Sequence, residues 1–272
     1  MTAIGETFRS LHVPGDPLVM INVWDRGTAK MMAALGAKAL ATSSAAHAYL
    51  MGKPDGGDVS RDDALAHAQE IVSATALPVQ GDFENGFGDD PDTCAETVRL
   101  SAEIGLAGIC IEDTMFPSGD AYAFDLTVER IKAAVSAARA LPQDFVLTAR
   151  ADGVLTGRYD VDEAFRRLQA FEKVGADCLY APLLPDMDAV RRVTSTLSKP
   201  VNVLAVGRMG KETRATLGDA GVARISIGSA LARTTQRVMH DLGQSMIEDG
   251  DFTGLKQTIS SDIVDKMLTG QS

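Results

Sequence analysis

The chain has 272 residues, 45% of them apolar, which is enough to bury the core of one large α/β domain or two small ones. Its 37 acidic and 26 basic residues give a net charge of −11, which argues against nucleic acid and anionic membranes as partners. No basic segment precedes an apolar run at the start, and no run approaches the ~20 apolar residues of a membrane span, so we expect a cytoplasmic protein. Three widely spaced cysteines, Cys94, Cys110 and Cys178, agree with a reducing compartment.

Short apolar runs alternate with longer segments of helical period along the chain, a pattern typical of a parallel sheet with crossover helices. The predicted strands span residues 18–23, 39–43, 79–83, 108–112, 145–149, 178–181, 201–206 and 224–228. The predicted helices span residues 26–35, 61–74, 91–104, 127–138, 161–174, 187–194, 210–220 and 230–249. Eight strand–helix units in this length predict a (β/α)8 TIM barrel rather than an open doubly wound sheet.

The predicted barrel, the catalytic domain, occupies residues 1–250 and leaves a helical extension at 251–272. Within 252–268 an apolar stripe follows helical spacing, formed by Leu255, Ile259, Ile263 and Met267. This ninth helix has no barrel position to fill. It either folds across one end of the barrel or packs on a neighbouring subunit, and we expect the second arrangement, in a homo-oligomer of two or four chains.

Acidic side chains follow the third and fourth predicted strands. Asp82 and Glu84 are two residues apart, a spacing that places both side chains on one face of an extended strand. Glu112 ends the next strand, about 4.8 Å away. Oxygen ligands clustered without histidine or cysteine favour Mg2+, with Mn2+ as a possible substitute. The alternative is a solvated acidic loop.

Arg150 ends the fifth predicted strand, beside this acidic cluster. Its planar guanidinium suits a substrate carboxylate or a developing enolate oxygen. The alternative is an ion pair with Glu112 or Asp152 that only ties the rim of the barrel together.

Hydroxyl groups follow the second strand at Thr42, Ser43 and Ser44, which form either a cradle for a carboxylate or phosphate or an ordinary turn with capping serines. Trp24 follows the first strand, and we expect it to bind the substrate together with these residues. His47, the one histidine near this rim, is a weaker candidate. The chain has no Ser-His-Asp grouping, no GxGxxG at a helix start and no P-loop, so dinucleotide-dependent hydride transfer and nucleotide hydrolysis lack support.

The segment GDFENGFG at 81–88 resembles the D-x-D-x-G-(F/Y)-G magnesium loop of the isocitrate lyase and phosphoenolpyruvate mutase superfamily, with glutamate in the second acidic place. Three further segments match in the right order: GKPD at 52–55, AGICIED at 107–113 and TAR at 148–150. The resemblance covers roughly residues 5–250 and implies a (β/α)8 barrel.

By position, the resemblance implies a Mg2+ site, held mostly through water, at Asp82, Glu84 and Glu112. It implies that the carboxylate of a 2-oxo acid binds at Thr42, Ser43 and Ser44. Asp55 would lie close to the reacting group, and Arg150 would contact the substrate oxygens. The chemistry common to the superfamily is formation or capture of a pyruvate-type enolate, and its members tend to form tetramers that exchange a C-terminal helix.

The lid segment departs from the superfamily pattern. Lyases carry K-(K/R)-C-G-H after the fourth strand, whereas residues 114–122 read TMFPSGDAY, without cysteine or lysine. Phosphonate-handling members use a lysine and an asparagine after Phe-Pro, and neither follows Pro117. The lyases' glutamate after the sixth strand is replaced by Pro182. A shortened lid remains, in which we expect Tyr122 to close over the substrate.

The sequence therefore predicts a Mg2+-dependent lyase that acts on a small 2-oxo acid through a pyruvate-type enolate, by oxaloacetate-like decarboxylation or C–C cleavage. One alternative is a phosphonopyruvate-type P–C bond mutase or hydrolase. Another is a non-catalytic 2-oxo acid binding protein, which the depleted lid motivates.

Overall fold

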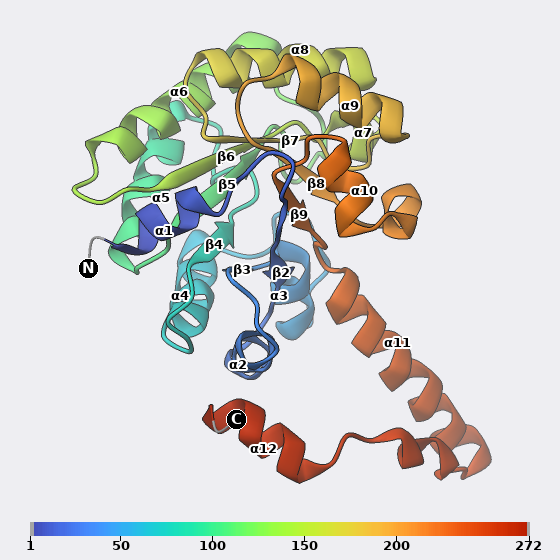
Figure 1. Ribbon diagram of the computed structural model, residues 1–272. Helices are drawn as coiled ribbons and strands as arrows, with labels where there is room; N and C mark the ends of the chain where they lie inside the picture. Colours follow the sequence, from blue (N-terminus) through green and yellow to red (C-terminus); the bar gives the residue numbers. More distant parts are fainter. Residues whose placement is uncertain (1–2, 271–272) are drawn as a thin grey trace.

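The computed structural model describes residues 3–270 and confirms the predicted barrel (Figure 1). Its parallel strands follow the order β1-β9-β8-β7-β6-β5-β4-β3-β2. The ends of this order, β1 (Leu18–Val19) and β2 (Ile21–Asn22), are halves of one predicted strand, separated only by Met20. Because β1 pairs with β9 and β2 pairs with β3, the sheet closes on itself.

The other strands are β3 (Leu40–Ala41), β4 (Val79–Asp82), β5 (Gly108–Glu112), β6 (Val146–Arg150), β7 (Cys178–Tyr180), β8 (Val201–Leu204) and β9 (Arg224–Ser226). When the register that starts at Glu112 is followed once around the barrel and extended along the strands, it arrives eight residues before Glu112. This displacement is the shear of a (β/α)8 barrel. A hydrogen-bonded row therefore descends toward the amino-terminal end of the barrel as it passes from β5 to β9.

The eight predicted helices are present as α2 (Arg26–Ala34), α4 (Arg61–Val72), α5 (Pro91–Glu103), α6 (Phe124–Ala140), α8 (Val161–Lys173), α9 (Met187–Thr196), α10 (Arg214–Asp219) and α11 (Ala230–Gln244). Three helices were not predicted: α1 (Ala3–Ser10), α3 (Ser44–Leu50) and α7 (Gly153–Thr156). A 3-10 turn, η1 (Gly207–Lys211), takes the start of the predicted 210–220 helix. Across the described helices, none is long and apolar enough to cross a membrane.

Side-chain caps explain why several helices begin where they do. Asp25 accepts a hydrogen bond from the Thr28 amide, and the Thr28 hydroxyl accepts one from the Asp25 amide, which forms a capping box at α2. Ser60 and Asp160 cap α4 and α8 in the same way with one bond each. These caps satisfy amide groups that the first helical turn leaves without partners.

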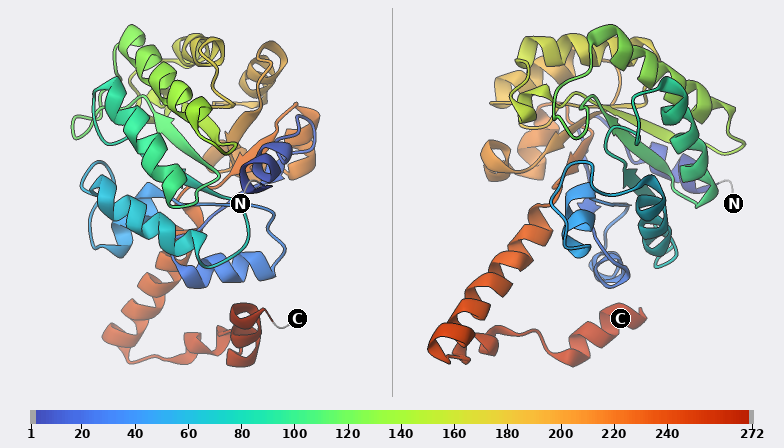
Figure 2. Two further views of the ribbon diagram at one scale, coloured as in Figure 1. Left: turned by 90° about the vertical axis from the view of Figure 1, so that its left-hand side faces the viewer. Right: turned by 180° about the vertical axis from the view of Figure 1, so that it is seen from behind.

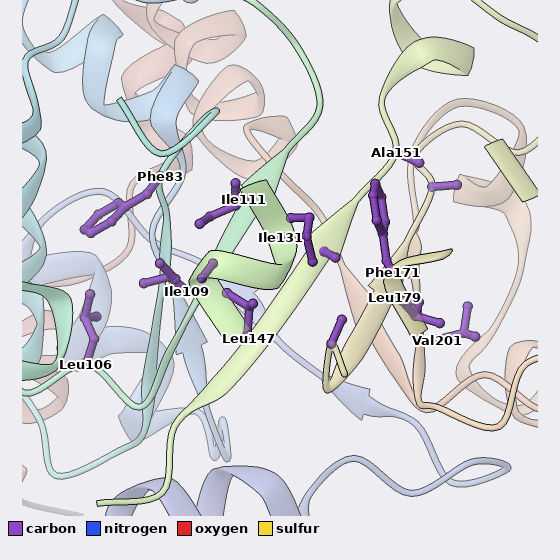
Figure 3. Close-up of a cluster of buried hydrophobic side chains, with 14 of the residues drawn as sticks. Phe83, Leu106, Ile109, Ile111, Ile131, Leu147, Ala151, Phe171, Leu179 and Val201 are labelled. Carbon is purple, nitrogen blue, oxygen red and sulfur yellow. The ribbon is translucent and has the colours of Figure 1, made fainter. Parts of the chain in front are cut away.

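The main apolar core lies between the sheet and the surrounding helices (Figure 3). Ile109 and Ile111 of β5 and Leu147 of β6 face Ile131 of α6 and Phe171 of α8 in this layer. Because side chains alternate along a strand, the residues between them point into the barrel. These inward residues are largely polar, so the interior of the barrel is available for binding and chemistry.

Helix α1 closes the amino-terminal end of the barrel. Phe8 is fully buried and packs with Leu18, Met20 and Val146 at the starts of the strands. His12 follows this helix and is also buried. The site must therefore open at the opposite end, where the strands finish.

The C-terminal segment departs from the prediction of one helix over 252–268. Helix α11 leads away from the barrel (Figures 1 and 2) and is followed by a π turn, η2 (Ser245–Asp249), a 3-10 turn, η3 (Thr253–Gln257), and α12 (Ser261–Thr269). The predicted helix is interrupted because Thr258 and Ser260 have extended backbone, so Ile259 lies outside any helix. In the structure α12 lies beside α2 of the same chain, so exchange between subunits stays a prediction. Residues 271–272 of the predicted extension lie outside the described residues.

Candidate active site

Two carboxylates and one arginine meet at the carboxyl ends of three neighbouring strands. Asp82 ends β4, Glu112 ends β5 and Arg150 ends β6. The register pairs Glu112 directly with Arg150. Nη1 of Arg150 lies 2.9 Å from Oε2 of Glu112 and 3.4 Å from Oδ1 of Asp82. The structure thus brings three of the predicted site residues into contact.

Arg150 is also held by Asp152. Its Nη2 donates to Oδ2 of Asp152 at 2.6 Å, and its Nε donates to Oδ1 of the same carboxylate. The ion pairs that the sequence left open as an alternative are therefore both present, to Glu112 and to Asp152. The guanidinium is fixed in orientation by three acids and still lines the central cavity, so its structural role does not remove it from the site.

Asp113, which the sequence analysis did not select, supports this arginine indirectly. Its Oδ1 accepts the Asp152 amide at 2.7 Å, and its Oδ2 is paired with Arg167 at 2.8 Å and accepts the Tyr159 hydroxyl at 2.6 Å. The only signal in the sequence was the acidic pair at the end of the fourth predicted strand.

Thr42 and Ser44, which follow β3, form hydrogen bonds with Asp82 of the acidic cluster. Both the amide and the hydroxyl of Ser44 donate to Oδ2 of Asp82 at 3.0 Å, and the Thr42 hydroxyl accepts the Asp82 amide at 2.8 Å. Ser43 caps α3 by accepting the Ala46 amide, as the capping alternative anticipated. Ser43 and Ser44 also line the central cavity, so binding of a substrate carboxylate there stays a prediction.

Glu84 reaches the cluster by a different route from the one predicted. Strand β4 ends at Asp82, and Glu84 has a left-handed backbone with φ of 45°, so the rule that places alternate residues on one strand face does not apply. Its side chain is buried and accepts the Gly57 amide at 3.4 Å. Burial, reinforced by the neighbouring charges of Asp82 and Asp55, raises the pKa of Glu84 to about 7.

Arg130 holds the loop that carries Glu84, and nothing local in the sequence indicated this. The arginine is 1% exposed and donates to the carbonyl oxygens of Asn85 and Gly88. Its guanidinium also stacks on the ring of Tyr122, 4.1 Å from the ring centre. Helix α6 thereby fixes the shape of the acidic loop.

Tyr122 is placed away from the expected substrate. It is 1% exposed, donates its hydroxyl to Oδ1 of Asp89 at 2.6 Å and accepts a bond from Asn85 at 2.9 Å. Within the described chain it is not among the residues that line the central cavity. This placement gives Tyr122 a role in anchoring the lid and does not support the expected contact with substrate.

Trp24 and His47 lie outside the central cavity, although His47 borders a separate small hollow that Asp82 and Glu84 also line. The Trp24 carbonyl accepts a bond from His67 at 2.8 Å, and its amide donates to Thr28 at the start of α2. The rings of His47 and His67 stack with centres 3.9 Å apart. Burial and the neighbouring His67 lower the pKa of His47 to about 4, so this histidine is neutral at physiological pH. Among the residues described, the central cavity is lined by neither Trp24 nor His47.

The central cavity has a volume of about 350 Å³ and extends from the rim into the barrel. Of the predicted residues, Ser43, Ser44, Asp55, Asp82 and Arg150 line it. Asp55 lies at the mouth, in the loop between α3 and α4. Enclosure by the surrounding protein and the charge of Asp82 raise the pKa of Asp55 above its usual range.

Acidic side chains outnumber basic ones at the rim, and their crowding and burial favour either protonation or a bound cation. Burial raises the pKa of Glu112 well above its usual range, and the nearby acids Asp152 and Asp82 add to the shift. The donors are all carboxylate oxygens, the ligands that Mg2+ prefers. No group of three acidic, histidine or cysteine residues in the described part of the chain is arranged to hold a metal directly. The residues therefore fit a largely hydrated Mg2+ ion, since this ion keeps several waters.

The family model of phosphoenolpyruvate phosphomutase matches residues 8–247 of this chain. The chain belongs to this family, within the isocitrate lyase/phosphoenolpyruvate mutase superfamily. This confirms the resemblance that the motifs at 52–55, 81–88, 107–113 and 148–150 indicated.

Individual relatives agree with this membership. An uncharacterized protein of Mycobacterium tuberculosis is 33% identical over 230 residues, 82% of each chain. The 2,3-dimethylmalate lyase of Eubacterium barkeri is 29% identical over 245 residues, 86% of this chain and 83% of that one. The crystal structure of a proposed lyase/mutase from Burkholderia cenocepacia J2315 superposes with a TM-score of 0.93 at 42% identity, covering 97% of this chain and 95% of that one.

Proposed function

We propose that this protein is a Mg2+-dependent lyase acting on a small 2-oxo acid. It breaks the bond that joins the carbon beside the keto group to its substituent, and the electrons of that bond form a pyruvate-type enolate. The observation that carries the proposal is the meeting of Asp82, Glu112 and Arg150 at the ends of neighbouring strands, where Asp82 and Arg150 line the central cavity. Membership of a family of lyases and mutases supports the same class of chemistry.

The protein's own groups have separate tasks in this proposal. Asp82, Glu84 and Glu112 hold the hydrated ion, which when bound supplies the Lewis acid that polarises the keto group. Arg150, fixed by Asp152 and Glu112, presents its guanidinium to the substrate oxygens and stabilises negative charge that develops there. Ser43 and Ser44 orient the carboxylate, and Asp55 at the cavity mouth lies beside the reacting carbon.

The lid favours reactions that need few acid–base groups. Residues 114–122 contain no lysine or cysteine, and the segment folds back on itself through a bridge between Thr114 and Ala121. Decarboxylation or C–C cleavage needs an electron sink and a proton, which the rim and water supply. A second candidate is phosphonopyruvate-type P–C bond chemistry, which the match to the phosphomutase model favours.

The test measures turnover of a panel of 2-oxo acids by proton NMR, with phosphonopyruvate followed by phosphorus NMR. We expect turnover of at least one acid in Mg2+ and none in excess chelator. Asp82→Asn should lower the rate by at least about 100-fold, whereas Asp188→Asn, at a side chain that is 95% exposed, should leave it unchanged.

Equal rates with chelator, or full activity of Asp82→Asn, would contradict the proposal. Turnover of phosphonopyruvate alone would favour the second candidate. Ligand-induced thermal stabilisation without turnover of any acid would favour the non-catalytic binding protein.

We also infer that the chain forms a homo-oligomer through α11 and the segment that follows it, residues 245–269, together called the C-terminal arm. Apolar side chains along this arm are exposed, among them Met239 at 72% and Ile247 at 87%. Several exposed apolar side chains gathered on one segment are typical of a protein interface.

A further inference from the structure

A second arginine, Arg224, lies inside the barrel below the rim and takes no part in the proposed chemistry. It is 1% exposed and is the first residue of β9. In the register it belongs to the row that runs from Glu112 through Arg150, Tyr180 and Asn202. Because this row descends by roughly 3 Å for each strand, Arg224 starts from a deeper layer of the barrel than Arg150 does.

Arg224 is a buried cation without a carboxylate partner. Its Nε donates to the Asn202 side-chain oxygen at 2.9 Å, and its Nη1 donates to the Gln80 side-chain oxygen at 2.7 Å and lies 3.2 Å from Nε2 of His12. All three partners are neutral groups, since burial lowers the pKa of His12 to about 3. None of the ion pairs in the described part of the chain includes Arg224, whereas Arg150 has three. An arginine remains protonated in a protein, and burial without a counter-charge is costly.

The remaining nitrogen of Arg224 faces open space. Nη2 has no hydrogen bond to any described residue, yet every fully enclosed side-chain nitrogen and oxygen of these residues has a partner. Nη2 is therefore not fully enclosed. Arg224 lines the central cavity, together with Asn202 and Ser226, so the free N–H groups are available to a molecule bound there.

We propose that Arg224 binds a second carboxylate of the substrate, at the floor of the cavity. The inference rests on the proposed function, because the first carboxylate and the keto group of the same molecule occupy the rim. The floor carries Arg224, whereas Asp82, Glu112 and Asp152 surround Arg150 at the rim, so the end of the substrate without the keto group is directed to the floor. The anion supplies the counter-charge that Arg224 lacks, through hydrogen bonds to a charged donor.

This assignment also distinguishes between the reactions. A carboxylate held by an otherwise unpaired guanidinium is one that the reaction keeps, because loss as neutral CO2 would forfeit the attraction. The substrate class is therefore a dicarboxylic 2-oxo acid, or its C–C adduct, whose distal carboxylate is retained when a bond near the rim breaks.

The experiment measures, by calorimetry in Mg2+, the binding of pyruvate, of oxaloacetate and 2-oxoglutarate, and of the two diacids esterified at the distal carboxylate. At least one diacid should bind about 10- to 100-fold more tightly than its own methyl ester and than pyruvate. Arg224→Met should abolish that difference and leave pyruvate affinity within about twofold, while Arg224→Lys retains part of it. Arg237→Met removes the same charge from an exposed site on α11 and controls for net charge.

If Arg224→Met fails to fold, the proposal is still tested in the unmodified protein, by comparing the affinity of each diacid with that of its own ester. Binding of pyruvate without any gain for either diacid, or a gain that survives in a folded Arg224→Met protein, would overturn the assignment and leave the proposed function standing. Failure of every 2-oxo acid to bind in Mg2+ would instead overturn both.

Discussion

At the scale of single residues, the site depends on charged groups whose partners are distant in the sequence. The rim residues Asp82, Glu112 and Arg150 were predictable because each ends an apolar run, and strand ends meet at one edge of a barrel. Arg130 and Asp113 were not, because their roles come from hydrogen bonds to groups 39 to 54 residues away that no local pattern encodes. Arg224 could have been selected from the sequence, because a charged residue in a predicted buried strand indicates a role inside the barrel.

The buried residue His12 predicts how the free energy of unfolding depends on pH. Burial, and then the charges of Arg224 and Arg9, lower the pKa of His12 to about 3, below the value of about 6.5 in the unfolded chain. The unfolded state therefore binds more protons between these values, and stability is lost as the pH falls from about 6.5 toward 3. At pH 5 the loss from this residue is about 2 kcal/mol.

Replacement by glutamine should flatten this dependence, because glutamine can accept from Arg224 and donate to the Phe8 carbonyl without titrating. The measurement is urea unfolding of His12→Gln and the unmodified protein between pH 4.5 and 8. His240→Gln, at an exposed histidine of α11, controls for loss of a histidine as such. Parallel stability profiles for His12→Gln and the unmodified protein would show that His12 is not buried in its neutral form.

At the scale of elements, strands and helices were predicted within a few residues where the apolar period was regular. The barrel followed from counting strand–helix units, and left-handed glycines such as Gly36 and Gly105 end helices at predicted boundaries. Helix α1 was missed because it is short and is stabilised by packing against the strand starts. The interrupted arm was missed because a stripe at helical spacing does not reveal an extended residue within it.

Two loops meet above the acidic cluster, and Gly57 is the point of contact. Its backbone φ is +91°, and an added Cβ would lie 2.7 Å from the Cβ of Phe116 in the lid. Gly57→Ala should therefore move the loop, weaken the amide contact to Glu84 and lower kcat/KM by about tenfold, with a stability loss of about 1 kcal/mol. Steady-state kinetics and thermal unfolding measure the two effects.

Gly52→Ala is the matched control, since Gly52 lies in the same loop with φ of +67° and an added Cβ would meet nothing within 4 Å. It carries the backbone strain without the clash and should keep its activity. Equal losses in both variants would mean that strain in the loop, and not contact with the lid, is responsible.

At the scale of the whole molecule, the C-terminal arm is notable because it leaves large apolar side chains exposed, among them Met239 and Ile247. Ile247→Glu and Met239→Glu should convert the inferred oligomer to a smaller species with an intact barrel, because a charge at the centre of an apolar interface is not tolerated. Light scattering after size exclusion gives the mass, and circular dichroism reports the fold. Gln236→Glu, exposed on the same helix, is the control. A monomer in the unmodified protein at micromolar concentration would refute the oligomer.

The first strand of the barrel is shared between two neighbours that lie far apart along the chain. Its first half, β1, pairs with β9, which lies about two hundred residues later in the chain, whereas its second half, β2, pairs with the nearby β3. During synthesis the cylinder must remain an open, unsealed sheet until residues 224–226 have left the ribosome. The last seam to form therefore also carries Arg224, so the floor of the cavity comes into existence only when the wall is complete.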